Sequence, residues 1–422
     1  AGRWVLKRGA VNFGGQPMFM SREGIWLTGT IPKLVLEGWG PLLSAPGGAA
    51  PIGLTGADVL VQNLDAYGYK VGGLHVNAIS REGTLTAQLA SRDANGEIIW
   101  EGQGKGRLHA RFKNLNLEKE EGDKKKLAAH KPAESAAAGK GAAASELPAL
   151  DLEVGDLTYK GMLLGRMELL AQHHGQDWML EHMRIVNPDG VLAVNGKWGL
   201  EGGKTQTQVN LKLEISDAGK VLARSGYPNS VKGGSGKLEA VLSWEGRPDD
   251  FSYATLDGTL KLDTGKGQFL KIKPGIGKLL GILSLQALPS HITLDFTDVF
   301  SEGFAFDSIY GAAQIKQGML STSNFRIYGS AAKVTMAGQV DLDRETQNLN
   351  IRILPTVGNS VSMLGAVTGG PLVGIGAFII NKLLREPLDK LVSFEYNVTG
   401  TWENPNVVKL GPSKPVAAET TD

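Results

Sequence analysis

Histidines, paired acids and glycine-rich turns are the features of this sequence that could carry catalysis or bind a metal. His173 and His174 are adjacent, so a β-strand would point them to opposite faces, which is poor geometry for one metal ion. Asp341 and Asp343 occupy positions typical of a turn or a solvated strand face. The chain has no Cys, which excludes thiolate catalysis and thiolate metal sites. No nucleophile is spaced with a general base. We therefore expect no catalytic residues, no metal and no cofactor, and hence no enzyme.

Two glycine-rich turns invite a nucleotide-binding interpretation that the sequence does not support. The run Gly233–Lys237 lacks the first glycine of a phosphate-binding loop, and Leu238 stands where Ser or Thr would coordinate magnesium. Gly265-Lys266-Gly267 is too short for a dinucleotide fingerprint. Both runs are more typical of turns beside strands.

Composition indicates a protein of many strands that does not bind nucleic acid. Lys and Arg total 44 against 43 Asp and Glu, a net charge of +1, so no overall field favours DNA or RNA. The 57 glycines fall mostly between short alternating runs, as in antiparallel strands joined by tight turns. We place such turns at 81–83 and at Asn95-Gly96. The chain opens on a strand-like run without a leader pattern, so we expect a segment of a longer protein with any targeting segment upstream.

The residues that remain as functional candidates are apolar side chains at every second position, because this alternation gives a strand one apolar and one polar face. We expect the outward set to be Asp151, Asn210, Lys212, Asp295 and Asp307. Strand alternation leaves two interpretations open, a dry β-sandwich core and a curved sheet whose apolar face accepts acyl chains. Under the second, the groove-lining residues are Leu150, Leu152, Val154, Val209, Leu211, Leu213, Leu294, Phe296, Phe304 and Phe306.

Internal similarity divides the chain into repeated strand units. Asp58 aligns with Asp151 and Gly68 with Gly161, both 93 residues later, whereas Gly303 lies 142 residues after Gly161. Units that cannot bury their apolar face alone must stack on neighbours, so the low-complexity linker interrupts a continuing structure. We predict the end of a preceding unit at 1–53, strand units at 54–117, 149–264 and 265–357, a charged and Ala-Gly-rich insertion at 118–148, apolar helices at 358–393, and a last strand with a polar tail at 394–422.

Helices are expected at 217–227 with Asp217 as N-cap, at 276–288 and within 360–393. No charge occurs between Arg352 and Lys382, yet Pro371 and several glycines cut this apolar stretch into short helices. The helix expected at 371–385 is about 22 Å long, short of the ~30 Å hydrocarbon core. Three roles stay open: dipping into one leaflet of a membrane, plugging the end of the groove, and spanning a membrane. The proposed membrane-contact residues are Val361, Leu364, Val367, Leu372, Ile375, Phe378, Ile379 and Leu383.

One long stretch carries a family resemblance. The run GKGQFLKIKPGIGKLLGILSLQALP, the following LDFTDVFSEGFAFDSI and the later FRIYGSAAKVTMAGQVDLDRETQ resemble the C-terminal periplasmic region of AsmA-like proteins of the Gram-negative envelope, which are related to TamB. The resemblance implies an elongated curled antiparallel sheet forming an apolar, taco-like β-trough with a few short helices near the C-terminus. It also implies a bridge-like protein in the periplasm, anchored in the inner membrane by a segment upstream of this chain, that carries phospholipids toward the inner leaflet of the outer membrane. Envelope protein partners are further implied. The alternative is a TamB-like structural scaffold for outer-membrane biogenesis.

Overall fold

The computed structural model describes residues 7–14, 23–36, 54–66, 68–119, 147–270, 303–330, 332–355 and 393–410. Over these residues the chain is mainly β, which confirms the predicted fold class. The chain divides into two compact units: unit 1 comprises residues 1–187 and 191–209, and unit 2 comprises residues 188–190 and 210–422. Each unit is built from strands whose alternating side chains separate a buried face from an exposed one.

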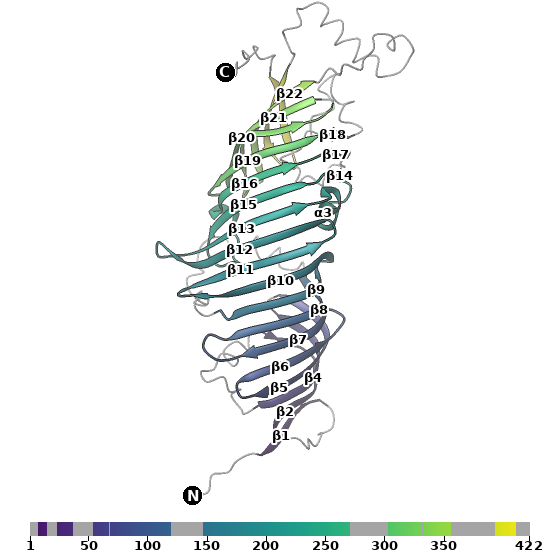
Figure 1. The fold of residues 1–422 in the computed structure, drawn as a ribbon, viewed down its shortest axis with the longest axis vertical. Helices are drawn as coiled ribbons and strands as arrows, with labels where there is room; N and C mark the ends of the chain where they lie inside the picture. The colour runs from purple at the N-terminus through teal and green to yellow at the C-terminus, as the bar shows by residue number, and fades with distance from the viewer. Residues whose placement is uncertain are drawn as a thin grey trace, which may run out of the picture. The chain divides into compact units, whose positions relative to one another are not determined.

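Unit 1 contains eleven described strands, which Figure 1 shows following one another in purple to teal. They are β1 (Arg8–Phe13), β2 (Gly24–Ile31), β3 (Leu34–Val35), β4 (Leu54–Ala66), β5 (Tyr69–Arg81), β6 (Thr84–Ala90), β7 (Ala94–Glu101), β8 (Arg107–Lys119), β9 (Ala149–Tyr159), β10 (Met162–His174) and β11 (Asp177–Asn187). Strands β12 (Gly190–Glu201) and β13 (Lys204–Ile215) contribute residues to both units.

The sheet of unit 1 is mixed, which corrects the expectation of antiparallel pairing throughout. Strands β4 to β8 form an antiparallel succession, as do β9, β10 and β11. However, β1 pairs parallel with β2, β2 and β3 pair parallel with β4, and β8 pairs parallel with β9. A parallel pair needs a connection of about a dozen or more residues to bring the chain back. The sequence between β8 and β9 provides that length at 120–148, so the predicted continuity of the sheet on both sides of this segment is confirmed.

One of the two predicted turns is confirmed and the other is wrong. Glu82 and Gly83 adopt positive φ values of 48° and 81° between β5 and β6, as a tight hairpin requires. Asn95 and Gly96 instead lie inside β7 and pair with β6. The turn comes earlier because the Ser91 hydroxyl accepts hydrogen bonds from the backbone N–H groups of Asp93 (3.1 Å) and Ala94 (2.9 Å).

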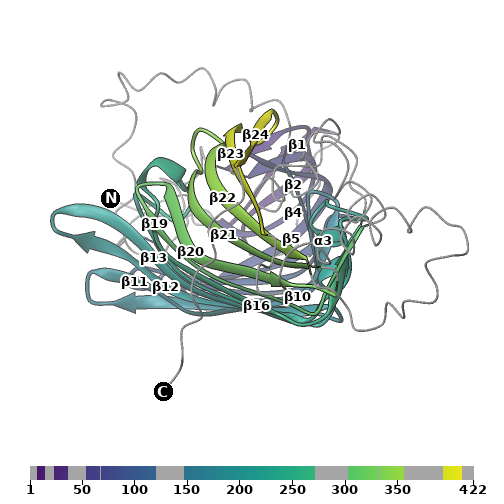
Figure 2. The same cartoon turned by 90° about the horizontal axis from the view of Figure 1, so that it is seen from above.

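The described strands of unit 2 curl through green to yellow in Figure 2. They are β14 (Val231–Gly233), β15 (Gly236–Glu245), β16 (Asp257–Thr264), β17 (Gly267–Phe269), β18 (Phe304–Phe306), β19 (Ser308–Lys316), β20 (Met319–Tyr328), β21 (Ala332–Asp341), β22 (Thr346–Pro355), β23 (Phe394–Thr401) and β24 (Pro405–Leu410). Neighbours pair antiparallel in the order β15, β16, β19, β20, β21, β22, β23, β24. Strands β14, β17 and β18 form a separate small sheet.

The two sequence offsets relate strands of the structure to one another. The offset of 93 residues carries β5 (Tyr69–Arg81) onto β10 (Met162–His174), and the glycines before them, Gly68 and Gly161, have matching φ values of 79° and 74°. The offset of 142 residues carries the starts of β11, β12 and β13 onto the starts of β20, β21 and β22. The same strand pattern therefore recurs along the chain.

Unit 2 also holds the short helix α3 (Ala218–Arg224) and a 3₁₀ turn at Tyr253–Thr255. The predicted N-cap is confirmed, because the Asp217 carboxylate accepts a hydrogen bond from the Lys220 N–H at 3.1 Å. The Arg224 Nε lies 2.7 Å from the carboxylate of buried Asp189, and the Lys220 ammonium lies 3.7 Å from it. The helices predicted at 276–288 and within 360–393 fall outside the described residues. No helix among the residues that the structure describes is long and apolar enough to cross a membrane.

Candidate functional site

The predicted apolar residues of β9 belong to three rows that cross four neighbouring strands of unit 1. Leu150, Leu152 and Val154 share one face of β9, and each lies opposite an apolar residue of β8 and of β10. The rows continue in register onto β11. They read Leu108, Leu150, Ala171 and Leu180; Ala110, Leu152, Leu169 and Met183; and Phe112, Val154, Met167 and Ile185. We call the surface that these rows form the apolar face of unit 1.

Two clusters of buried hydrophobic residues include or contact residues of the apolar face. Ala171 and Trp198 are fully buried beside Trp178, and Leu150 and Leu169 pack against them. A second cluster is centred on Val59 and Val61 of β4, with Phe112 of β8 packed against it. Leu150 and Leu152 themselves are half-buried, while Val154 is 1% exposed. The face thus combines firmly packed positions with partly accessible ones.

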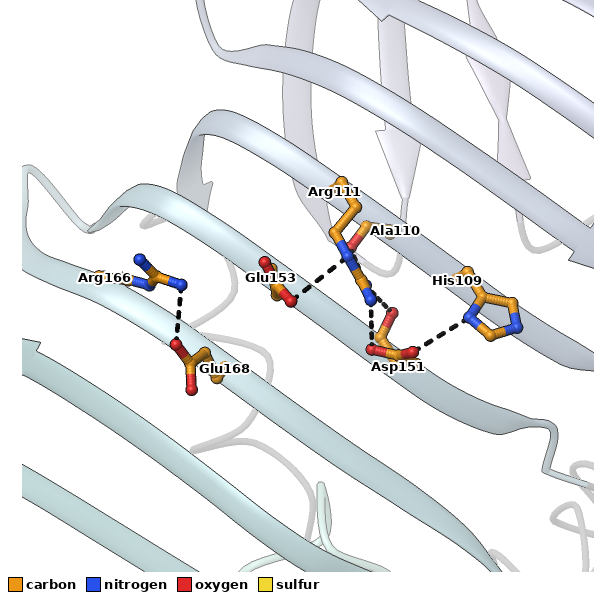
Figure 3. Close-up of polar contacts among 7 residues, drawn as sticks. All are labelled: His109, Ala110, Arg111, Asp151, Glu153, Arg166 and Glu168. Atoms are coloured by element: carbon orange, nitrogen blue, oxygen red, sulfur yellow. Dashed lines mark hydrogen bonds and ion pairs between the residues drawn. The ribbon is translucent and has the colours of Figure 1, made fainter.

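The opposite face of the same strands is charged, as Figure 3 shows. The Asp151 carboxylate accepts hydrogen bonds from His109 Nδ1 at 3.1 Å and from Arg111 at 2.9 Å. Arg111 also lies 3.5 Å from Glu153, and Arg166 pairs with Glu168 at 2.9 Å on β10. Because successive residues of a strand point to opposite sides, apolar side chains on one face alternate along these strands with charged side chains on the other.

The surroundings of Asp151 shift the pKa of its carboxyl group. Burial alone raises the pKa of its carboxyl, but the hydrogen bonds and charges of Arg111 and His109 outweigh burial and hold the pKa below its usual range. A carboxyl whose pKa is lowered by folding stabilises the folded state above its unfolded pKa, and this contribution is lost as pH falls through the folded pKa.

We therefore predict that the stability advantage of wild type over Asp151→Asn is present above about pH 4 and disappears at lower pH. The measurement is urea unfolding of both chains between pH 6 and pH 2.5, chosen to bracket the carboxyl titration. Asp58, an exposed acid that pairs with His75 at 2.8 Å, provides the control as Asp58→Asn, because its carboxyl is about half exposed. A pH-independent difference for Asp151→Asn would contradict the assignment.

Strand β13 shows the same alternation. Leu211 and Leu213 are half-buried, whereas Lys212 and Glu214 are exposed. The Lys212 ammonium lies 2.8 Å from Glu214, and this hydrogen bond raises the pKa of Lys212. Val209 and exposed Asn210 continue the pattern toward the start of the strand.

The described part of unit 2 has an apolar face of its own, whose residues were not among the predicted groove-lining residues. Its rows cross β20 to β23 in register and are almost fully buried. On the opposite face, the Arg352 Nε donates to Glu395 at 2.6 Å. The alternation in VTMAGQV and NLNIRIL was the signal that could have identified these strands. The rows include Ile327, Val334 and Ile353; Met336, Ile351 and Tyr396; and Leu349 with Val398.

The remaining predicted residues are placed elsewhere or not described. Phe304 and Phe306 are buried in the small sheet, where the Phe306 ring centroid lies 4.9 Å from that of Phe269. Asp307 is exposed and lies next to them in the sequence. Leu294, Asp295 and Phe296 lie outside the described residues, as do all the predicted membrane-contact positions from Val361 to Leu383. Within the described ranges, no group of three or more His, Asp or Glu side chains is placed to hold a metal ion.

Comparison with known proteins gives a consistent assignment. The chain is 29% identical over 248 residues to the Intermembrane phospholipid transporter YhdP of Escherichia coli (strain K12). That alignment covers 58% of this chain but only 20% of the relative, so the chain spans a small part of the relative's length. No solved structure gives a significant match. The model of the YhdP protein family matches residues 1–407, and the chain therefore belongs to the YhdP family.

Proposed function

We propose that this chain is part of a bridge-like lipid transfer protein that carries phospholipid acyl chains along the apolar faces of its sheet. The observation that carries the proposal is the register of the rows: apolar residues stand directly opposite one another on consecutive strands from β8 to β11. The printed name of the Escherichia coli relative, an intermembrane phospholipid transporter, supports the same cargo.

A path for acyl chains along the sheet must be continuous. Moving an acyl chain along a protein surface requires apolar contact at every step, since an unpaired buried polar group costs on the order of 2 kcal/mol or more. Neighbouring strands lie ~4.8 Å apart, so a row of side chains in register offers a new apolar contact at about that interval. Leu152, flanked by Ala110 and Leu169, lies in the middle of such a path.

We also propose a cellular location and partners for this function. The cargo is phospholipid, and the direction is across the periplasm of a Gram-negative bacterium toward the inner leaflet of the outer membrane. Residues beyond this chain in the longer protein would provide the inner-membrane anchor, and envelope proteins are further partners. Transfer of a lipid between surfaces makes and breaks no covalent bond, so the proposed function needs neither catalytic residues nor a cofactor.

Photo-crosslinking at two adjacent positions tests the proposal. A crosslinking residue at half-buried Leu211 is expected to capture phospholipid, whereas one at exposed Lys212 is not, because the two side chains leave opposite faces of β13. Both chains are expressed in a Gram-negative host, irradiated, purified and analysed for attached lipid by mass spectrometry.

The comparison has a built-in control, since the two positions share the same strand and the same local backbone. Equal labelling at Leu211 and Lys212, or no labelling at either, would overturn the acyl-chain path. The sandwich-core interpretation would then account better for the apolar faces.

A further inference from the structure

Gln347 is a polar residue in an otherwise apolar setting. It is the second residue of β22 and is only 5% exposed. Among the described residues, neither its side-chain nitrogen nor its side-chain oxygen has a hydrogen-bond partner. Alternation along β22 places it on the same face as Leu349, Ile351 and Ile353, which are all buried. The amide is therefore buried on the same side of the sheet as the apolar rows of unit 2.

The cross-strand neighbours of Gln347 have no side-chain donor or acceptor that could form a hydrogen bond with its amide. Register pairs it with Val340 of β21 on one side and with Gly400 of β23 on the other. Val340 is apolar and fully buried, and Gly400 has no side chain, so no side chain of β23 stands opposite the amide. The exposed residues Asp343 and Arg344 occupy the turn just before β22. Gln347 thus lies at the boundary between a charged turn and the apolar rows.

An unpaired buried amide destabilises the folded chain, and a leucine at this position would avoid that penalty. A buried donor or acceptor without a partner carries the full penalty of its lost hydration. Leucine has nearly the same volume as glutamine, prefers buried strand faces and would continue the row of Leu349 and Ile351. Polar groups that break a local rule in this way concentrate at functional sites.

We propose that Gln347 binds the polar junction of a glycerophospholipid whose acyl chains lie on the apolar face of unit 2. The amide Nε2 donates to an ester carbonyl of the lipid, and Oε1 accepts from an N–H or O–H of the headgroup. In a phospholipid the ester carbonyls lie between headgroup and tails, which matches the position of Gln347 between the turn and the apolar rows. This inference rests on the proposed function, because it assumes that acyl chains occupy the face.

The test compares two lipids that differ only at the ester. Binding of a diacyl phosphatidylethanolamine and of its dialkyl ether analogue, with equal chain lengths, is measured for the 422-residue chain and for Gln347→Leu. Wild type is expected to bind the ester lipid about fivefold more tightly, the range of one hydrogen bond, and Gln347→Leu is expected to bind both alike. Without lipid, Gln347→Leu is expected to have the higher Tm, which also shows that it folds.

Asn350→Leu is the matched control, since Asn350 lies on the same strand but is exposed on the opposite face. It should retain the wild-type preference for the ester lipid. A wild-type chain that binds both lipids equally, or a Gln347→Leu chain that keeps the preference, overturns the role of Gln347 while leaving the acyl-chain path intact. A wild-type chain that binds neither lipid overturns this inference together with the proposed function.

Discussion

A Leu152→Asp chain is expected to retain its fold but to lose at least about nine-tenths of its co-purifying phospholipid. Leu152 occupies the middle of the three rows of unit 1, between Ala110 of β8 and Leu169 of β10. Under the proposed function, a carboxylate there would interrupt the acyl-chain path, and bringing an acyl chain against it would cost several kcal/mol. Each 1.4 kcal/mol changes the dissociation constant about tenfold, so the loss of bound lipid should be easy to measure.

Two controls separate a blocked path from a damaged fold. Leu152→Ala keeps the position apolar and should retain most of the lipid, whereas Glu153→Asp changes the neighbouring residue on the charged face and should retain all of it. Leu152 is half-buried, so the aspartate can remain hydrated while the face is empty. Phospholipid is extracted with organic solvent and quantified per mole of protein, beside a thermal melt of each variant. If Leu152→Asp unfolds the chain or leaves bound lipid unchanged, the rows form an ordinary core.

The largest effect on stability is expected at the ion pair between Arg224 of α3 and Asp189. The Asp189 side chain is 6% exposed, and Arg224 Nε bonds it at 2.7 Å. Arg224→Leu removes the nearest cation from a buried carboxylate, which should destabilise unit 2 by about 3 kcal/mol. The loss is held to the lower end of the usual range because the Lys220 ammonium stays 3.7 Å away. Urea unfolding followed by circular dichroism gives the change in the free energy of unfolding.

An exposed pair of the same residue types in unit 2 is the matched control. Arg247 bonds Asp249 at 2.9 Å, but the Asp249 side chain is 69% exposed. Arg247→Leu should therefore change the free energy of unfolding by less than about 1 kcal/mol. Combining Arg224→Leu with Asp189→Asn removes the buried negative charge and should recover part of the loss. Similar effects for Arg224→Leu and Arg247→Leu would show that burial of Asp189 does not decide the energetics.

Local patterns were enough to predict the strands and their faces, because side-chain direction follows directly from the two-residue period. The alternation around Leu211 and Lys212 is one such case, and the Asp217 cap of α3 is another, since a capping hydrogen bond spans only three residues. The 93-residue offset in the sequence also relates two strands of equal length, β5 and β10.

What the sequence could not predict depends on long-range partners. The parallel pairing of β8 with β9 is set by where the chain returns after 120–148, and no local signal encodes that return. The misplaced turn at Asn95-Gly96 has a different cause, a competing hydroxyl on Ser91. Gln347 escaped notice because its isolation depends on the identity of Val340 and Gly400 opposite it, which only the register of three strands reveals.

The turns at Gly68 and Gly161 imply that this family can change length in whole steps. Both glycines adopt the same left-handed conformation and lead into strands of equal length, β5 and β10. A recombination event that joined the chain before one glycine to the chain after the other would delete or duplicate five strands and preserve the phase of every side chain. Repeat number can therefore change during evolution without redesigning the sequence of any strand.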